Sequence, residues 1–201
     1  MTRIVAIPVK PFDAAKKRLS GVLTTEARQA LSVELARRTA NAAIAAGAAP
    51  LILSADEVVS EWATSQRYDV LLDEGSSLDE AAHAATLFAK NEPWLICHAD
   101  LPLLRAEDLA RAVELMAQGS WMLAPSSDGG TSLIGGIGRF GFSFGPASFH
   151  RHLARLSHRP VRVMTSLGTL LDLDVPGDFS AAAAHPRGAW LNSVAPIRSD
   201  R

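Results

Sequence analysis

The chain has little cysteine, no excess of either charge and no long apolar run. Its single cysteine, Cys97, cannot form a disulfide within the chain. Lysine and arginine total 20, and aspartate and glutamate total 21, so no overall field attracts nucleic acid or an anionic membrane. No stretch approaches the roughly 18 consecutive apolar residues of a membrane-spanning helix, and the chain starts in a strand-like pattern rather than an apolar signal region. We therefore expect a soluble, cytoplasmic protein, with neither nucleic acid nor membrane as a partner.

Several catalytic motifs are also missing. The phosphate-binding loop that ends in Gly-Lys-Ser or Gly-Lys-Thr is absent, which argues against a conventional P-loop ATPase or GTPase. No nucleophile elbow is present. The six histidines lack zinc-protease spacing, and His150 and His152 would diverge on a helix. Cys97 lies inside an apolar run, which favours a buried small side chain over a nucleophile.

Short apolar runs alternate with helical patterns along most of the chain. We expect strands near 3–9, 50–54, 70–72, 93–98, 161–164 and 169–173, and helices near 24–47, 56–67, 78–90, 106–119, 146–157 and 177–184. Such alternation predicts a single-domain α/β fold, a mostly parallel, doubly wound sheet with helices on both faces. The domain is expected to cover residues 1–184, and residues 185–201 to form a loosely ordered tail. Ligands of such sheets lie beyond the carboxyl ends of the strands.

The region from Trp121 to Gly145 is rich in glycine and breaks the alternation. We expect loops or an insertion from WMLAPSSDGG through GGIGRFGFSFG. The string GIGRFG at 136–141 matches the glycine spacing of a dinucleotide fingerprint. That fingerprint follows a first strand and opens a helix, whereas this string comes late and runs into FSFGP. It is interpreted as a loop or a hairpin.

Asp100 closes the apolar run WLICHA and precedes Leu101 and Pro102. Its carboxylate should therefore lie at the carboxyl end of a strand, facing the ligand crevice, where a metal ligand belongs. The alternative is a cap for the following helix, but Glu107 and Asp108 lie nearer to the start of that helix.

A second acidic group follows in the string LLDLDVPGDF. Asp172 and Asp174 alternate with period two before a Pro-Gly turn, so one of them would face the crevice. Two carboxylates from separate strand ends can hold a Mg²⁺ ion that keeps its other positions for water and phosphate oxygens. Asp178 is instead expected to cap the last helix.

Basic residues crowd the loop that follows the first strand. Lys10, Lys16, Lys17 and Arg18 lie within nine residues, where doubly wound folds receive phosphates. Their charge could neutralise a triphosphate and its departing pyrophosphate. Taken alone, such a run is more often a solvated surface loop, so its position carries the interpretation.

Five strings together resemble one family. They are IPVKPFDAAKKRLS, ADLPLL, GGTSL, FGPAS and DLDVPGDF, spread in order from about residue 4 to residue 180. The chain resembles the 2-phospho-L-lactate guanylyltransferase family, which serves biosynthesis of the deazaflavin coenzyme F420. Members of this family act on phospholactate, phosphoenolpyruvate or 3-phosphoglycerate, and the sequence does not choose among these acids. The first string is the most specific, because the aspartate motifs alone also fit relatives that activate sugars or molybdopterin.

The resemblance implies a fold of the nucleotide-diphospho-sugar transferase (GT-A-like) type, a role for each motif residue and a possible homodimer. Asp100 and Asp174 would bind Mg²⁺. GTP would be met by Pro8, Lys10, Lys16 and Arg18, of which Lys16 and Arg18 would act in catalysis with Asp100. Thr131, Gly145 and Ser148 would hold the phosphorylated acid. A phosphate acceptor is already ionised near neutral pH, so the missing nucleophile and base are expected.

The chain departs from the family at two places. Ser77, Leu78 and Asp79 stand where Gly-Leu-Asn is expected, and Ser132 follows Thr131 where Asn is expected. Asp79 could still accept hydrogen bonds from the N1 and N2 donors of guanine, which would disfavour adenine. Two alternatives stay open, a metal-dependent glycosyltransferase and a GTP-binding module without turnover.

Overall fold

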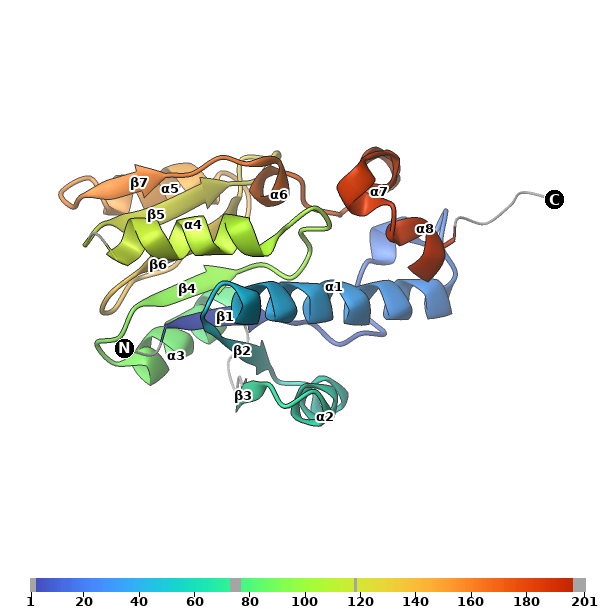
Figure 1. The fold of residues 1–201 in the computed structure, drawn as a ribbon, viewed down its shortest axis with the longest axis horizontal. Helices are drawn as coiled ribbons and strands as arrows, with labels where there is room; N and C mark the ends of the chain where they lie inside the picture. Colours follow the sequence, from blue (N-terminus) through green and yellow to red (C-terminus); the bar gives the residue numbers. More distant parts are fainter. Residues whose placement is uncertain (1–2, 73–76, 118, 197–201) are drawn as a thin grey trace.

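A seven-stranded sheet organises the computed structural model, which describes residues 3–72, 77–117 and 119–196. The strand order is β3-β2-β1-β4-β6-β5-β7 (Figure 1). These strands are β1 (Ile4–Pro8), β2 (Ala49–Ser54), β3 (Asp69–Leu72), β4 (Trp94–Cys97), β5 (Trp121–Pro125), β6 (Thr131–Gly136) and β7 (Val161–Val163). Strand β6 runs antiparallel to β4 and β5, and the other pairings are parallel. The predicted mostly parallel α/β fold is confirmed.

Helices cover both faces of this sheet, as expected for right-handed crossovers. Buried side chains of α1, α2 and α4 pack on one face with Val5 and Ile7, and those of α3 meet Ile4 and Ala6 on the other face. The helical elements are η1 (Lys17–Leu19), α1 (Thr25–Ala45), α2 (Glu57–Ser65), α3 (Leu78–Ala89), α4 (Ala106–Ala117), α5 (Ser148–Arg155), α6 (Leu167–Leu170), α7 (Pro176–Ala184), η2 (Pro186–Gly188) and α8 (Leu191–Val194).

Helix α1 shows how local signals set these elements. The Thr24 side chain accepts a hydrogen bond from the Ala27 backbone N–H at 3.1 Å, which satisfies one free donor of the first turn. Gly47, with φ of 75°, follows the end of the helix and takes the left-handed conformation that glycine adopts without strain. Ala36, Ala40 and Ala43 are completely buried and let the helix lie close to the sheet.

The expectation of loops between Trp121 and Gly136 was wrong, because β5 and β6 form an antiparallel hairpin there. Its glycines mark close packing rather than a flexible segment. A Cβ on Gly135 would lie 2.9 Å from the Trp94 carbonyl oxygen, and a Cβ on Gly136 would lie 2.5 Å from the Trp121 ring. Glycine is therefore needed in β6 so that β4, α4 and Trp121 can pack closely against it. Glycine is unusual inside strands, which is why the sequence pattern did not indicate a strand here.

Replacing Gly136 with Ala should destabilise the protein by about 2 kcal/mol, because the new methyl group overpacks a filled core. Three atoms of the Trp121 ring would lie within 2.8 Å of the added Cβ. Gly141→Ala is the matched control, since no atom lies within 4 Å of a Cβ built there. Urea unfolding measures both variants. Equal midpoints for the two would contradict the close-packing explanation.

The last segments also differ from expectation. The predicted strand at 169–173 is wrong: residues 167–170 form the short helix α6, capped by the Ser166 side chain, and residues 171–174 lie outside the sheet. Residues 185–196, expected in a loosely ordered tail, include η2 and α8. Leu191 is completely buried, and it packs with Leu31 and Leu35 of α1 in a cluster at the carboxyl end of the sheet.

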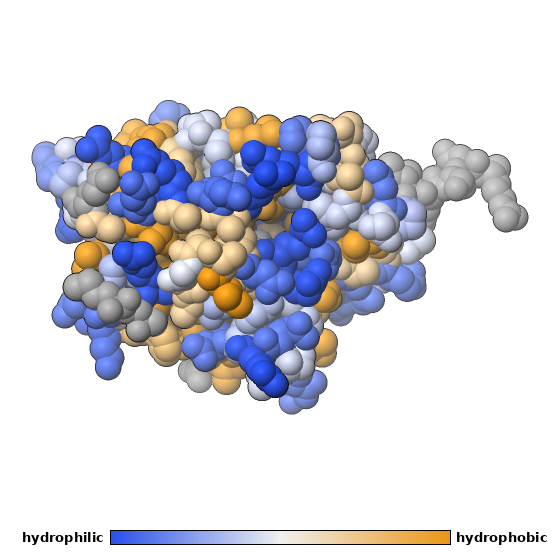
Figure 2. All heavy atoms as spheres, viewed as in Figure 1, coloured by the Kyte–Doolittle hydropathy of each residue, from blue (hydrophilic) through white to orange (hydrophobic). Residues whose placement is uncertain are grey.

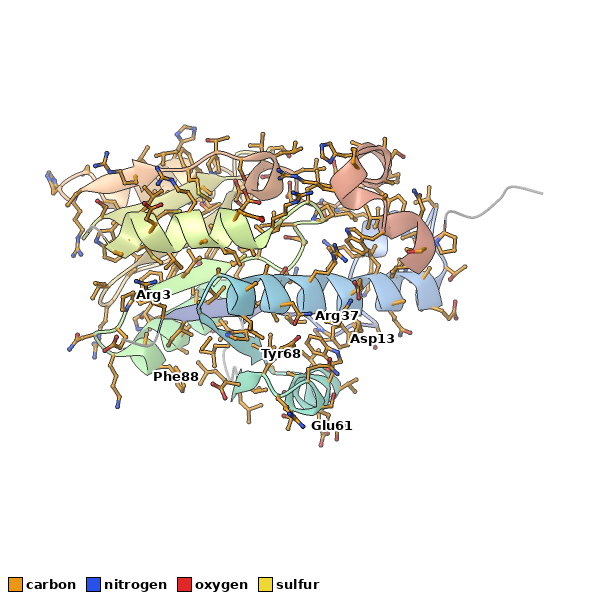
Figure 3. The ribbon with its side chains drawn as sticks, viewed as in Figure 1. Arg3, Asp13, Arg37, Glu61, Tyr68 and Phe88 are labelled. Atoms are coloured by element: carbon orange, nitrogen blue, oxygen red, sulfur yellow. The ribbon has the colours of Figure 1, made fainter. Side chains whose placement is uncertain are left out.

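The outer surface is mixed in character. Figure 2 shows hydrophilic and apolar residues interspersed over the face that carries α1 and α4. In the part of the chain that the structure describes, no helix combines the length and apolar character that a membrane crossing requires. Tyr68, which directly precedes β3 and is labelled in Figure 3, donates from its hydroxyl to Asn41 Oδ1 at 2.9 Å and links the β3 edge to α1.

Candidate functional site

The candidate site lies at the carboxyl edge of the sheet. Strands β1, β4 and β5 end there, and β6 starts there because it runs in the opposite direction. Four segments meet at this edge: the loop after β1, residues 98–103 after β4, the turn at 126–130, and residues 171–174. Their meeting point is where a doubly wound sheet places its ligand.

Lys16 joins two of these segments. Its Nζ donates to Asp100 Oδ2 at 3.2 Å and to the Leu173 carbonyl oxygen at 2.6 Å. The Leu173 backbone N–H in turn donates to the Asp100 carbonyl oxygen at 2.9 Å. Lys16 has a left-handed backbone (φ 54°) just before η1, and its side chain is only 11% exposed. The loop conformation thus directs this lysine inward, against Asp100.

Asp100 is held as a carboxylate. Burial acts to raise its pKa, but the Lys16 ammonium and His98 outweigh that effect, so the pKa of Asp100 lies below its ordinary value. Its Oδ1 atom is buried and has no hydrogen-bond partner in the described part of the chain. A buried, charged oxygen without a donor is a position that a cation could satisfy.

Asp172 and Asp174 have different surroundings. Asp174 forms an ion pair with Arg18, and both side chains are largely exposed, at 49% and 72%. Asp172 Oδ1 accepts from Ser127 Oγ at 3.2 Å. Burial and then the charge of Asp100 raise the pKa of Asp172 above its ordinary value. The charge of Asp100 therefore acts on Asp172, while Asp174 is joined to the basic loop.

The fit of a magnesium ion rests on these carboxylates. Within residues 3–72, 77–117 and 119–196, no three histidine, cysteine, aspartate or glutamate side chains are grouped so that they could hold a metal together. The unpartnered Oδ1 of Asp100 and the repulsion between Asp100 and Asp172 nevertheless suit a cation that both would contact. Mg²⁺ commonly takes one or two carboxylates and completes its shell with water and phosphate oxygens, so the donor set fits it.

Asp178, as expected, caps α7: its Oδ2 accepts from the N–H groups of Asp174 and Val175 at 2.9 and 2.8 Å.

The remaining basic residues of the loop divide into two groups. Arg18 reaches the acidic segment through Asp174, whereas Lys17 is exposed. Lys10 is also exposed, and its charge acts on His98. Pro8 is the last residue of β1 and pairs with Leu53 of β2. The structure thus brings Lys16 and Arg18 to the carboxylates, and leaves Lys10 at the rim of the same edge.

A second group of polar side chains lies beside the start of β6. Ser148 Oγ donates to Thr131 Oγ1 at 3.1 Å, and Thr131 Oγ1 lies 2.9 Å from His152 Nδ1. Thr131, Ser148 and His152 are at most 3% exposed. Gly145, with φ of 100°, makes the turn before α5, and its carbonyl oxygen accepts from the Ser148 N–H at 3.0 Å. The three residues expected to hold the acid are therefore neighbours.

Asp79 lies in the first turn of α3, whose start is capped by Ser77. Its Oδ1 accepts from the Phe144 backbone N–H at 2.7 Å. Asp79 thereby ties α3 to the loop before α5. Arg151 donates hydrogen bonds to the same loop, to Ser143 Oγ at 2.9 Å and to the Ser143 carbonyl oxygen at 2.8 Å.

Two histidines of the site were not singled out from the sequence. His98 packs against Phe144, with ring centroids 5.2 Å apart and ring planes tilted by 48°, and its Nε2 is buried without a partner in the described residues. Burial lowers the pKa of His98, and the charge of Asp100 acts against that shift. His152 connects Thr131 to the loop before α5. The only sequence signal for His98 was its place two residues before Asp100, and His152 had none.

A cavity of about 470 Å³ lies elsewhere, at the amino ends of β1 and β2. Its lining includes Ile4, Ala49, Asp69 and Phe88. Figure 3 labels Phe88 well apart from Asp13, which lies in the loop after β1 on the side of the candidate site. Neither Asp100 nor Lys16 lines this cavity. We therefore assign the catalytic chemistry to the carboxyl edge of the sheet.

Known proteins match most of the chain. The family model described as "Guanylyl transferase CofC like" matches residues 2–191. A phosphoenolpyruvate guanylyltransferase from Rubrobacter xylanophilus is 33% identical over 194 residues, covering 92% of this chain and 95% of the relative. A 2-phospho-L-lactate guanylyltransferase from Methanothermobacter thermautotrophicus is 30% identical, covering 94% and 87%.

The fold has relatives among solved structures. A protein from Desulfovibrio desulfuricans, described as a nucleotide-diphospho-sugar transferase, superposes with a TM-score of 0.78 over 96% of this chain and 95% of its own. Its sequence is 15% identical, so the likeness concerns the fold. It supports the expected nucleotidyltransferase-type architecture.

Proposed function

Because this chain belongs to the guanylyl transferase CofC-like family, we propose that it joins the GMP part of GTP to a small phosphorylated acid and releases pyrophosphate. Guanylyltransferases are nucleotidyltransferases, and this chain is an enzyme of that class. The proposed acids are 2-phospholactate, phosphoenolpyruvate and 3-phosphoglycerate, and the proposed pathway is coenzyme F420 biosynthesis.

One observation carries the proposal: Lys16 contacts Asp100 at the carboxyl edge, beside an Asp100 oxygen that has no partner among the described residues. A lysine and an ionised carboxylate in one partly enclosed place suit a triphosphate and its metal. Mg²⁺ would be held by Asp100 together with Asp172 or Asp174, and when bound it would supply positive charge to the transferring phosphate.

The residues of the chain would then position two anions. Lys16 and Arg18 would neutralise charge on the triphosphate, and the largely exposed pair of Arg18 with Asp174 is weak enough to exchange for a phosphate. Thr131 and Ser148 would hold the acid with its phosphate oxygen toward the α-phosphorus. That oxygen is ionised near neutral pH and attacks without a general base, while pyrophosphate leaves in line.

Asp79 would select guanine, and Asp79→Asn tests this assignment. Asn can still accept from the Phe144 N–H, so the loop contact is kept. The amide NH₂ would replace one acceptor that guanine's N1–H and N2–H₂ need. We expect the preference for GTP over ATP to fall at least about tenfold, the cost of roughly one lost hydrogen bond. Specificity constants for both nucleotides measure it, and an unchanged ratio would remove Asp79 from nucleotide selection.

The proposed function is tested by measuring pyrophosphate release. GTP, ATP, CTP and UTP are each combined with the three acids, with Mg²⁺ and with excess chelator. Release with GTP and one acid, abolished by the chelator, would support the proposal. Cleavage of a nucleotide sugar without pyrophosphate would favour a glycosyltransferase, a fold relative suggested by the nucleotide-diphospho-sugar transferase architecture. A GTP-dependent rise in melting temperature without any product would favour a binding module.

A further inference from the structure

His152 is enclosed by aromatic rings and takes no part in the transfer described above. The ring is completely buried. The centroids of Phe140, Phe142 and Phe144 lie 5.6, 6.2 and 5.0 Å from the His152 centroid. Packing on this scale fixes the orientation of the imidazole, so its two nitrogens have defined and different partners.

The partner of Nε2 identifies the tautomer. The Ser143 backbone N–H donates to His152 Nε2 at 3.0 Å, and a backbone N–H can only donate. Nε2 therefore carries a lone pair. Burial, followed by the charge of Arg155, lowers the pKa of His152 to about 4, so the ring is neutral near pH 7. Its single proton is then on Nδ1.

The proton on Nδ1 sets the direction of the adjoining hydrogen bonds. Nδ1 lies 2.9 Å from Thr131 Oγ1 and donates to it. Ser148 Oγ donates to the same oxygen at 3.1 Å. Both lone pairs of Thr131 Oγ1 are then used, and the hydroxyl hydrogen of Thr131 is left to donate elsewhere. If the two hydroxyls exchange roles, the hydrogen of Ser148 is left instead.

We propose that His152 is a positioning residue that makes the Thr131–Ser148 hydroxyl pair a hydrogen-bond donor to an anionic oxygen of the substrate. The inference rests on the proposed function, in which these two hydroxyls hold the phosphorylated acid. Whichever of the two hydroxyls keeps its free hydrogen, the Thr131–Ser148 pair can donate one hydrogen bond. The pair therefore favours a substrate with a carboxylate or phosphate oxygen next to it. A substrate group that can only donate, such as an ammonium, would leave two donors facing each other.

The kinetic test compares His152→Leu with His152→Asn. Leu removes the donor, and we expect the KM for the acid to rise about tenfold while the KM for GTP stays within about twofold, as for the loss of one oriented hydrogen bond. The Asn side-chain NH₂ can occupy the place of Nδ1–H, so His152→Asn should recover most of the loss. His150→Leu is the matched control, because His150 lies on the same helix and is exposed.

A double-mutant cycle separates positioning from general packing. If His152 acts through the Thr131 hydroxyl, His152→Leu should add less than about twofold to the KM of Thr131→Val. A full tenfold addition would overturn the proposal, and so would equal changes in KM for the acid and for GTP. Melting temperatures identify variants that have lost their fold. If His152→Leu does not fold, the KM values of His152→Asn are compared with those of the native protein instead.

The tautomer is measured without turnover. In the native protein at pH 7, ¹⁵N NMR should show Nε2 of His152 unprotonated and Nδ1 protonated, and the opposite tautomer would overturn the proposal. If the native protein forms no product with any acid, the proposed function fails separately. Calorimetry with phosphoenolpyruvate then replaces KM: weaker binding by His152→Leu would support the inference, and equal affinity or no binding by the native protein would overturn it.

Discussion

Asp100→Asn should reduce kcat by about 10³-fold, equivalent to roughly 4 kcal/mol of transition-state stabilisation. The substitution keeps the size of the side chain and removes its negative charge. Lys16 would keep its bond to the Leu173 carbonyl oxygen, so the loop should remain in place. The lost charge is the one proposed to hold Mg²⁺ beneath the triphosphate. Steady-state pyrophosphate release measures the effect, with folding checked by thermal unfolding.

Asp69→Asn is the matched control for Asp100→Asn. Asp69 starts β3 and lines the cavity at the amino ends of the strands, away from the candidate site, and it is exposed. The control should leave kcat unchanged. Turnover that stays magnesium-dependent and near the native rate in Asp100→Asn would remove Asp100 from the metal site.

Lys16→Met should impair both turnover and stability. It removes a positive charge proposed to meet the triphosphate, for which we expect a loss of about 10²-fold in kcat. It also leaves the Asp100 carboxylate without its ammonium partner. Removing one member of a fully buried pair costs 3–5 kcal/mol, and Asp100 is 33% exposed, so about 2 kcal/mol is expected here. Pyrophosphate release and urea unfolding measure the two effects.

Lys17→Met tests whether Lys16 acts through its own contacts or only through the summed charge of the loop. Lys17 is adjacent to Lys16 in sequence but is exposed. The control should change kcat by less than about twofold, because a solvated charge contributes little. If Lys17→Met and Lys16→Met lose equal activity, the loop would act only through its summed charge, and the inward direction of Lys16 would have no catalytic role.

The sequence predicted most of the scaffold because its strands and helices carry strong local patterns. Strands β1 and β4 are continuous apolar runs, and α1 has both a capping threonine and a terminal glycine. Local patterns failed where tertiary packing decides. Gly135 and Gly136 are the last residues of strand β6, where neighbouring atoms leave no room for a Cβ. Residues 167–170 form a helix because Ser166 caps it, although the sequence there suggested a strand.

The candidate site was predictable in part, for the same physical reason. Residues at strand ends fall on the carboxyl edge in any doubly wound sheet, so Lys16 and Asp100 could be placed together from topology. The assignment between Asp172 and Asp174 could not, because it depends on Ser127 and Arg18, which approach from distant segments. The proposed role of His152 depends on its tautomer, which the Ser143 backbone N–H fixes. The spacing of residues in the sequence does not indicate such a contact.

The contacts of Lys16 also determine when the site can form during synthesis. The residues that accept its two hydrogen bonds are Asp100 and Leu173, which come 84 and 157 positions later in the chain. At roughly 5–20 residues per second, the Leu173 carbonyl leaves the ribosome on the order of 10–30 s after Lys16. A nascent chain can therefore complete the β1-β2-β3 part of the sheet while the lysine still lacks its final acceptor. Lys16 can accordingly take its final contacts only after the chain through Leu173 has been synthesised.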